Sequence, residues 1–83
     1  MTDPDLAAAW AAVRANCPVG WFVGQPGYED RYRQWLMFAF DQSERAVMGG
    51  RERQWIATGQ TELHCVWEMA RCLGESKAGR WPK

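Results

Sequence analysis

The sequence has few of the features that would mark a membrane protein, a secreted protein or a disulfide-bonded one. No apolar run approaches the roughly 18 residues of a membrane span, and the acidic start, Thr2 to Asp5, is unlike the basic start of a signal peptide. We therefore expect a cytoplasmic protein with no membrane partner. The three cysteines, Cys17, Cys65 and Cys72, are odd in number and lack the paired spacing of a disulfide framework, so we expect free, mostly buried thiols.

Net charge is also absent, because ten Lys and Arg residues balance ten Asp and Glu residues. This neutrality disfavours a protein whose main role is general attraction to nucleic acid or anionic lipid. The 83 residues are enough for one hydrophobic core and too few for two. We expect a single α+β domain at residues 1–75 and a flexible basic tail at residues 76–83.

The sequence lacks the usual parts of a catalytic or metal site. It contains no Gly-x-Ser-x-Gly elbow, no phosphate-binding glycine loop before a helix and no constellation of paired carboxylates. The one histidine, His64, has Glu68 one helical turn later, a spacing found both in acid/base sites and in exposed surface pairs. Cys65 and Cys72 do not have the Cys-x₂₋₄-Cys spacing of a zinc site. We expect no enzyme activity, no cofactor and no metal.

Two segments have the apolar periodicity of helices. The first covers residues 6–16, with Thr2 or Asp3 as its cap. The second begins at Thr61 and is expected to stop at Gly74. Their expected buried residues are Leu6, Ala9, Trp10, Val13 and Cys17 in the first helix and Leu63, Val66, Trp67, Ala70 and Leu73 in the second.

Three segments rich in β-branched and aromatic residues predict strands at residues 19–23, 32–41 and 51–58. The connection at residues 42–50 could be a long loop or a short extra strand with a Gly-Gly hairpin, and we favour the loop. The resulting order, α-β-β-β-α, predicts an α+β fold in which two helices pack on one face of a three-stranded antiparallel sheet.

The two faces of this predicted sheet differ in chemistry. One alternating set of residues is purely apolar and comprises Leu36, Phe38, Phe40 and Ile56. The other set is mixed and comprises Arg33, Trp35, Met37, Arg51, Arg53 and Trp55. We expect the apolar set to face the helices and the mixed set to be exposed. Alternatively, Trp35 and Trp55 are covered by residues 42–50 or by the tail and form a second small core.

The mixed set is the candidate site, because tryptophan and arginine are enriched at binding hot spots. The sequence favours a small non-enzymatic binding module that contacts a protein partner or a second copy of itself through these residues, with Trp81 of the tail as a further contact. One alternative is a nucleic-acid-binding domain that stacks bases on Trp35 and Trp55. Another is an enzyme that uses His64 and Glu68.

Scarce lysine, frequent arginine and abundant alanine give the chain a composition that resembles small proteins of actinobacteria and their phages. This resemblance implies a bacterial or phage origin and no particular activity, and a small accessory protein would fit the size of the chain. The predicted order of elements is similar to that of the double-stranded RNA-binding domain, a family with basic residues at the start of its second helix. Here residues 59–64 contain no lysine or arginine, and Glu62 has the opposite charge. The resemblance implies a topology without that family's RNA contacts.

Overall fold

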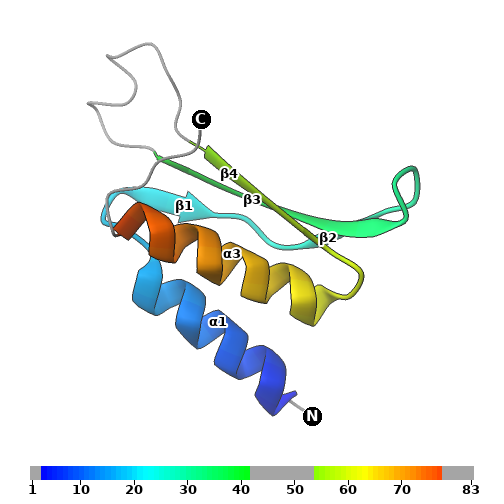
Figure 1. The fold of residues 1–83 in the computed structure, drawn as a ribbon, viewed down its shortest axis with the longest axis horizontal. Coiled ribbons are helices and arrows are strands. Elements are labelled where there is room, and N and C mark those ends of the chain that lie inside the picture. The colour runs from blue at the N-terminus through cyan, green and yellow to red at the C-terminus, as the bar shows by residue number, and fades with distance from the viewer. Residues whose placement is uncertain (1–2, 42–53, 78–83) are drawn as a thin grey trace.

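The computed structural model describes residues 3–41 and 54–77. Their elements, in chain order, are α1 (Pro4–Asn16), β1 (Trp21–Val23), β2 (Gly27–Glu29), β3 (Gln34–Asp41), β4 (Gln54–Gly59) and α3 (Glu62–Lys77). Both helices lie on the same side of the sheet, with α3 next to the strands and α1 packed along α3 on the outside (Figure 1). The predicted α+β class, with helices against an antiparallel sheet, is confirmed.

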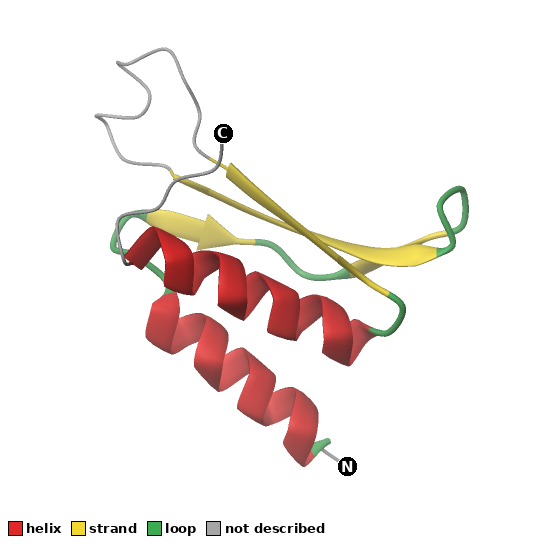
Figure 2. Ribbon diagram, in the orientation of Figure 1, coloured by secondary structure: helices red, strands yellow, loops and turns green. Residues whose placement is uncertain are grey.

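The sheet is built around β3, which pairs antiparallel with all three other strands. β1 and β2 follow one another along one edge of β3, joined by a short loop (Figure 2), while β4 runs along the other edge. Phe22 of β1 lies opposite Phe40, and Phe38 lies opposite Ile56 of β4. The short strand β2 was not predicted, since Pro26 and Gly27 look like turn residues in the sequence.

The start and end of α1 agree with the prediction. Asp3 is the N-cap, and its Oδ1 accepts hydrogen bonds from the backbone nitrogens of Asp5 at 2.9 Å and Leu6 at 3.4 Å. Pro4 occupies the first helical turn, where its missing N–H would have no helical partner. The helix ends at Asn16.

The start of α3 was predicted correctly, but its end was not. The Thr61 hydroxyl accepts a hydrogen bond from the backbone nitrogen of His64 at 3.0 Å, which is the expected cap. The helix then passes through Gly74 and continues to Lys77, so Ser76 is a buried residue of its last turn. A β-carbon at Gly74 would lie 3.3 Å from Nδ2 of Asn16. The glycine therefore allows close packing against α1 and does not stop the helix.

The buried side of α3 is rotated relative to the predicted one. Trp67 was expected in the core but is 45 % exposed. The buried residues of the helix are Cys65, Val66, Met69, Ala70, Cys72, Leu73 and Ser76. Small and flexible side chains on this side let α3 approach the sheet closely, which a bulky indole would prevent.

Two strands start later than predicted because left-handed backbone precedes them. Gly20, with φ of 89°, still belongs to the turn before Trp21. Arg33, with φ of 54°, donates its backbone N–H to the Asp30 carbonyl at 3.3 Å and closes the turn before Gln34. Neither conformation can continue a strand, so each strand begins at the residue after the left-handed one, two positions later than predicted.

The face of the sheet that was predicted to be buried is the exposed one. Met37 and Ala39 of β3 are fully buried beneath the helices, and Ala57 of β4 is 2 % exposed. By contrast, Phe38 is 46 % exposed and Ile56 is 50 % exposed. The prediction that Leu36, Phe38, Phe40 and Ile56 face the helices is therefore wrong.

The reason for this reversal is the size of the side chains. α3 follows directly on β4, and a β-carbon at Gly59 would lie only 2.6 Å from the backbone nitrogen of Cys65. Such a short separation leaves room for Ala39 and Ala57 under the helix but not for phenylalanine rings. The phenylalanines occupy the alternate positions, which point away from α3, whereas Trp35, Met37 and Trp55 share the helix side with the two alanines.

Candidate functional site

Of the four predicted contact residues that the structure describes, three lie away from the exposed surface. Met37 is fully buried, while Trp35 and Trp55 are half-buried and pack against the core. Of the mixed set within the described chain, only Arg33 is exposed, in the turn before β3. Arg51, Arg53 and Trp81, like the predicted 42–50 loop, lie outside the described residues. Because Trp35 and Trp55 are half-buried, neither presents a fully exposed ring for base stacking.

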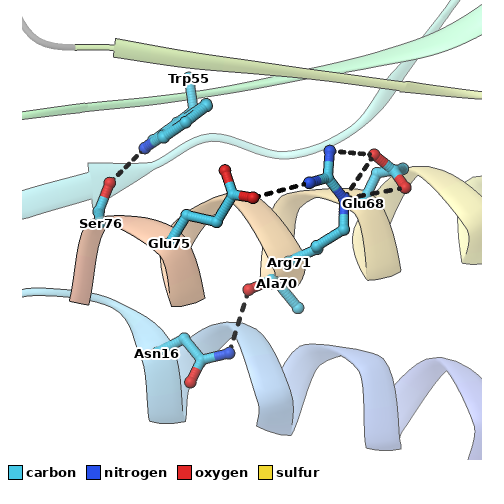
Figure 3. A network of polar contacts seen from close by, with 7 residues as sticks. All are labelled: Asn16, Trp55, Glu68, Ala70, Arg71, Glu75 and Ser76. Carbon is cyan, nitrogen blue, oxygen red and sulfur yellow. Dashed lines mark hydrogen bonds and ion pairs between the residues drawn. The ribbon is translucent and has the colours of Figure 1, made fainter. Parts of the chain in front are cut away.

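Trp55 joins the sheet to the end of α3. Its indole Nε1 donates a hydrogen bond to the Ser76 hydroxyl, and the ring lies between β4 and the last turn of the helix (Figure 3). The hydroxyl is buried, so this bond satisfies both polar groups inside the fold. Trp55 is therefore a structural anchor.

Of the His64 and Glu68 pair considered from the sequence, Glu68 takes part in an ion-pair network with Arg71 and Glu75. Arg71 donates to the carboxylate of Glu68 at 3.0 Å and to that of Glu75 at 3.3 Å (Figure 3). The hydrogen bond from Arg71 is the main reason that the pKa of Glu68 is lowered, with a smaller contribution from the charge of His64. This arrangement has the spacing of an exposed ion pair on a helix surface.

The three cysteines are free thiols, and Cys65 and Cys72 are buried. The Cys65 thiol donates a weak hydrogen bond to the Ala57 carbonyl at 3.5 Å, and burial raises the pKa of Cys65 to about 11. A thiol with this pKa remains protonated and unreactive near neutral pH. Within residues 3–41 and 54–77, no three His, Cys, Asp or Glu side chains are grouped to hold a metal ion.

The raised pKa of Cys65 predicts a loss of stability in alkaline solution. An unfolded cysteine ionises near pH 8.5, whereas the folded thiol keeps its proton up to about pH 11. Because unfolding releases this proton, the free energy of unfolding should fall as the pH rises through this interval. Urea unfolding at pH 7, 9 and 10 measures the slope, which should be shallower in Cys65→Ala. An identical slope in both proteins would contradict the assignment.

The exposed side of the sheet carries a cluster of large apolar side chains. We call it the phenylalanine face, and it consists of Phe22, Leu36, Phe38, Phe40 and Ile56. Phe22 is 48 % exposed, and its ring centroid lies 5.3 Å from that of Phe40. Figure 1 shows no described helix on this side of the strands. Apolar clusters of this kind often mark binding surfaces.

A groove with a volume of about 460 Å³ is hollowed into the phenylalanine face. It is lined by Phe22, Gly24, Phe38, Phe40 and Gln54. Gly24 donates its backbone N–H to the Phe38 carbonyl at 2.8 Å and so extends the β1 pairing by one residue. Because Gly24 has no side chain, the space above it stays open between the surrounding rings.

The phenylalanine face is uncharged around the groove. By strand alternation, no described residue of β1, β3 or β4 on this side carries a charge, since Asp41 pairs with Trp21 on the helix side. Glu29 of β2, opposite Gln34, also lies on this side, beyond Leu36 and outside the groove. Gln54 supplies the amide at the rim of the groove. The surface can therefore bind by apolar contact and by a few neutral hydrogen bonds.

Sequence reasoning missed this site because it assigned the core by polarity alone. The signal that could have found it is the run of small residues at alternate positions, Ala39 in β3 and then Ala57 and Gly59 in β4. Small residues facing one another across a layer indicate close helix packing. From these small residues, the helices would have been placed on the side of Ala39 and Ala57, and the phenylalanines would have been placed at the surface.

Within the described part of the chain, no helix is both long and apolar enough to span a lipid bilayer. Comparisons of the chain with protein-family models, with curated proteins and with solved structures gave no match.

Proposed function

We propose that this protein is a small non-enzymatic binding module that holds an apolar segment of a partner protein on its phenylalanine face. The observation that supports this most is the exposure of neighbouring large apolar side chains around a groove of about 460 Å³. The candidate site therefore moves from the mixed tryptophan and arginine set to the opposite side of the sheet. Free thiols favour a cytoplasmic location for such a module, consistent with a bacterial or phage accessory protein.

The exposed area is large enough to drive association. A phenylalanine side chain presents roughly 200 Å² when free, so Phe22 and Phe38, each nearly half exposed, leave roughly 200 Å² of apolar surface in water. Covering that area contributes about 5 kcal/mol before the entropic cost of association is subtracted. Ile56 adds to the same surface. A short peptide segment that fills the groove can bind on this basis.

The chemistry of the partner segment follows from the charge of the face. Because the residues that line the groove carry no charge, they offer no ion pair to phosphates or carboxylates, and a charged segment would lose hydration there without compensation. The partner segment should be apolar and uncharged, with large side chains for the groove. Its affinity should change little with salt, unlike that of a nucleic-acid ligand.

The proposal can be tested with a phage-displayed library of short peptides. Selection on the immobilised protein should enrich sequences rich in large apolar residues and poor in charge. Gly24→Val should weaken binding of the selected peptides at least ten-fold, because the new side chain fills the groove. The fold should tolerate it, since the β-carbon would meet the Phe38 carbonyl oxygen at an ordinary 3.4 Å.

Gly27→Val is the matched control. Gly27 begins β2 opposite Leu36, outside the residues that line the groove, and a β-carbon there would have nothing within 4 Å. Peptide affinity should be unchanged in this variant, and both variants should retain the wild-type circular dichroism. Failure to enrich any peptide, or equal affinity of Gly24→Val and wild type, would overturn the proposal. Enrichment of charged sequences whose affinity falls steeply with salt would point to a different surface.

A further inference from the structure

The free edge of β4 is a feature separate from the groove of the phenylalanine face, although Ile56 contributes its side chain to that face. β4 pairs with β3 along one side, and no other described strand pairs with its opposite side. A strand edge of this kind presents unpaired backbone N–H and C=O groups. The residues of β4 whose backbone groups point outward determine what can pair with this edge.

The hydrogen bonding of β3 shows which groups of β4 point outward. The Phe38 carbonyl accepts the N–H of Gly24, so the backbone polar groups of Phe38 point toward β1 and away from β4. In an antiparallel ladder, the residue opposite, Ile56, then directs its own N–H and C=O away from β3. By alternation, Gln54 and Thr58 do the same.

The edge has none of the devices that usually prevent strand pairing. Natural edge strands are protected by lysine or other charges, by proline or by bulges. The six residues Gln54–Gly59 contain no charge and no proline, and their pairing with β3 is regular. The chain as a whole has no net charge, so two copies do not repel one another.

We infer that two copies of this chain pair through β4, antiparallel, about a two-fold axis at Ile56. In this register Ile56 lies opposite its own copy and Gln54 lies opposite Thr58 of the second copy, so all three outward residues exchange both backbone hydrogen bonds. Centring the axis one residue later, on Ala57, would leave Gln54 without a partner inside β4. The observed direction of the backbone groups therefore selects the first register.

The side chains fit this register on both faces of the sheet. On the phenylalanine face, the two isoleucines meet as a β-branched pair, and glutamine meets threonine on either side of them. On the helix side, Trp55 lies opposite Ala57 of the second copy, so a large side chain meets a small one. The row from Phe38 through Ile56 then continues across the axis, and the two phenylalanine faces become one surface.

The inference predicts a monomer to dimer transition at micromolar concentrations, since a single strand pair buries less surface than a standard interface. Sedimentation velocity measures it. Ile56→Lys and Ile56→Glu should each weaken dimerisation at least ten-fold, because like charges then lie directly opposite. An equimolar mixture of the two variants should restore the dimer, since an ammonium group then faces a carboxylate.

Phe22→Lys is the matched control. Phe22 lies on the same face with nearly the same exposure as Ile56, but it belongs to β1 at the other edge of the sheet. This variant should dimerise like the wild type. A wild type that stays monomeric up to about 300 µM, far above the micromolar range expected for a weak interface, would overturn the inference. So would a Phe22→Lys variant as defective as Ile56→Lys, because that pattern means face-to-face stacking.

Amide hydrogen exchange gives a readout that requires no substitution. The N–H groups of Ile56 and Thr58 should exchange rapidly in dilute protein and slow down with increasing concentration, whereas an unchanged rate would overturn the inference. The pairing does not depend on the peptide site, and Gly24→Val should dimerise normally. Loss of peptide binding and loss of dimerisation are therefore separate results.

Discussion

Replacing Gly59 with alanine is expected to lower the free energy of unfolding by about 3 kcal/mol, in the upper range for overpacked positions. The new β-carbon would lie 2.6 Å from the backbone nitrogen of Cys65 and 3.0 Å from the carbonyl carbon of His64. Both are backbone atoms at the start of α3, so no rotamer change can relieve the overlap. The helix would have to move away from β4, and calorimetry should show a melting temperature lower by about 12–24 °C.

Gly27→Ala is the control for the effect that any glycine to alanine substitution has on the unfolded chain. Its β-carbon would have nothing within 4 Å, and the residue is exposed. Alanine there should leave stability unchanged or raise it by up to about 1 kcal/mol, because it restricts the unfolded chain. Equal destabilisation by the two substitutions would show that close packing at Gly59 is not the cause.

Met37→Ala is expected to destabilise the protein by about 3 kcal/mol, while Phe38→Ala should cost about 1 kcal/mol or less. Met37 is fully buried under α3, so its removal leaves a cavity as well as losing buried area. Phe38 is 46 % exposed and loses less on truncation, although it is the larger side chain. Urea unfolding of both variants measures the difference.

The order of these two effects tests which face of the sheet is buried. If Phe38→Ala were the more destabilising, the phenylalanines would belong to the core and the binding face would be lost with them. Met37→Leu is a useful companion, because it nearly conserves volume and should cost less than about 1.5 kcal/mol. A cost equal to that of Met37→Ala would indicate that Met37 does more than fill space.

The helix boundaries that depend on local chemistry could be predicted from the sequence. Asp3 and Thr61 both cap helices because a short polar side chain can reach the free N–H groups of the first turn. This interaction involves residues only two or three positions apart, so nothing distant competes with it. The first helix and the start of the second were predicted correctly for this reason.

The buried face of the sheet could not be predicted in the same way, because it depends on a distance between two elements. Polarity favoured the wrong face because Arg33 was counted in the strand, whereas it lies in the turn before β3 and both faces of β3 itself are mainly apolar. The deciding fact is how closely α3 approaches β4, which is set by the tight connection at Gly59. The same contact explains why Trp67 is exposed: the sulfur-containing residues of α3, Cys65, Met69 and Cys72, take its place against the sheet.

Gly74 was misinterpreted for a related reason. A glycine near the end of a helical pattern often terminates the helix, and the local sequence gives no sign to the contrary. In the folded protein, Asn16 of α1 donates its side-chain N–H to the Ala70 carbonyl at 3.0 Å (Figure 3). The same side chain lies against Gly74. A β-carbon at Gly74 would crowd this side chain, at 3.3 Å from its Nδ2, and Asn16 is 58 positions away in the sequence.

The packing of α1 along α3, and not among the strands, has a consequence for how the protein is made. A ribosome releases the N-terminal segment first, yet the helix on which its Trp10 and Val13 stripe packs is encoded near the other end of the chain. That stripe must stay in water, or be shielded by a chaperone, until nearly the whole described chain has been synthesised. Translation must therefore reach α3 before the N-terminal helix has its main packing partner.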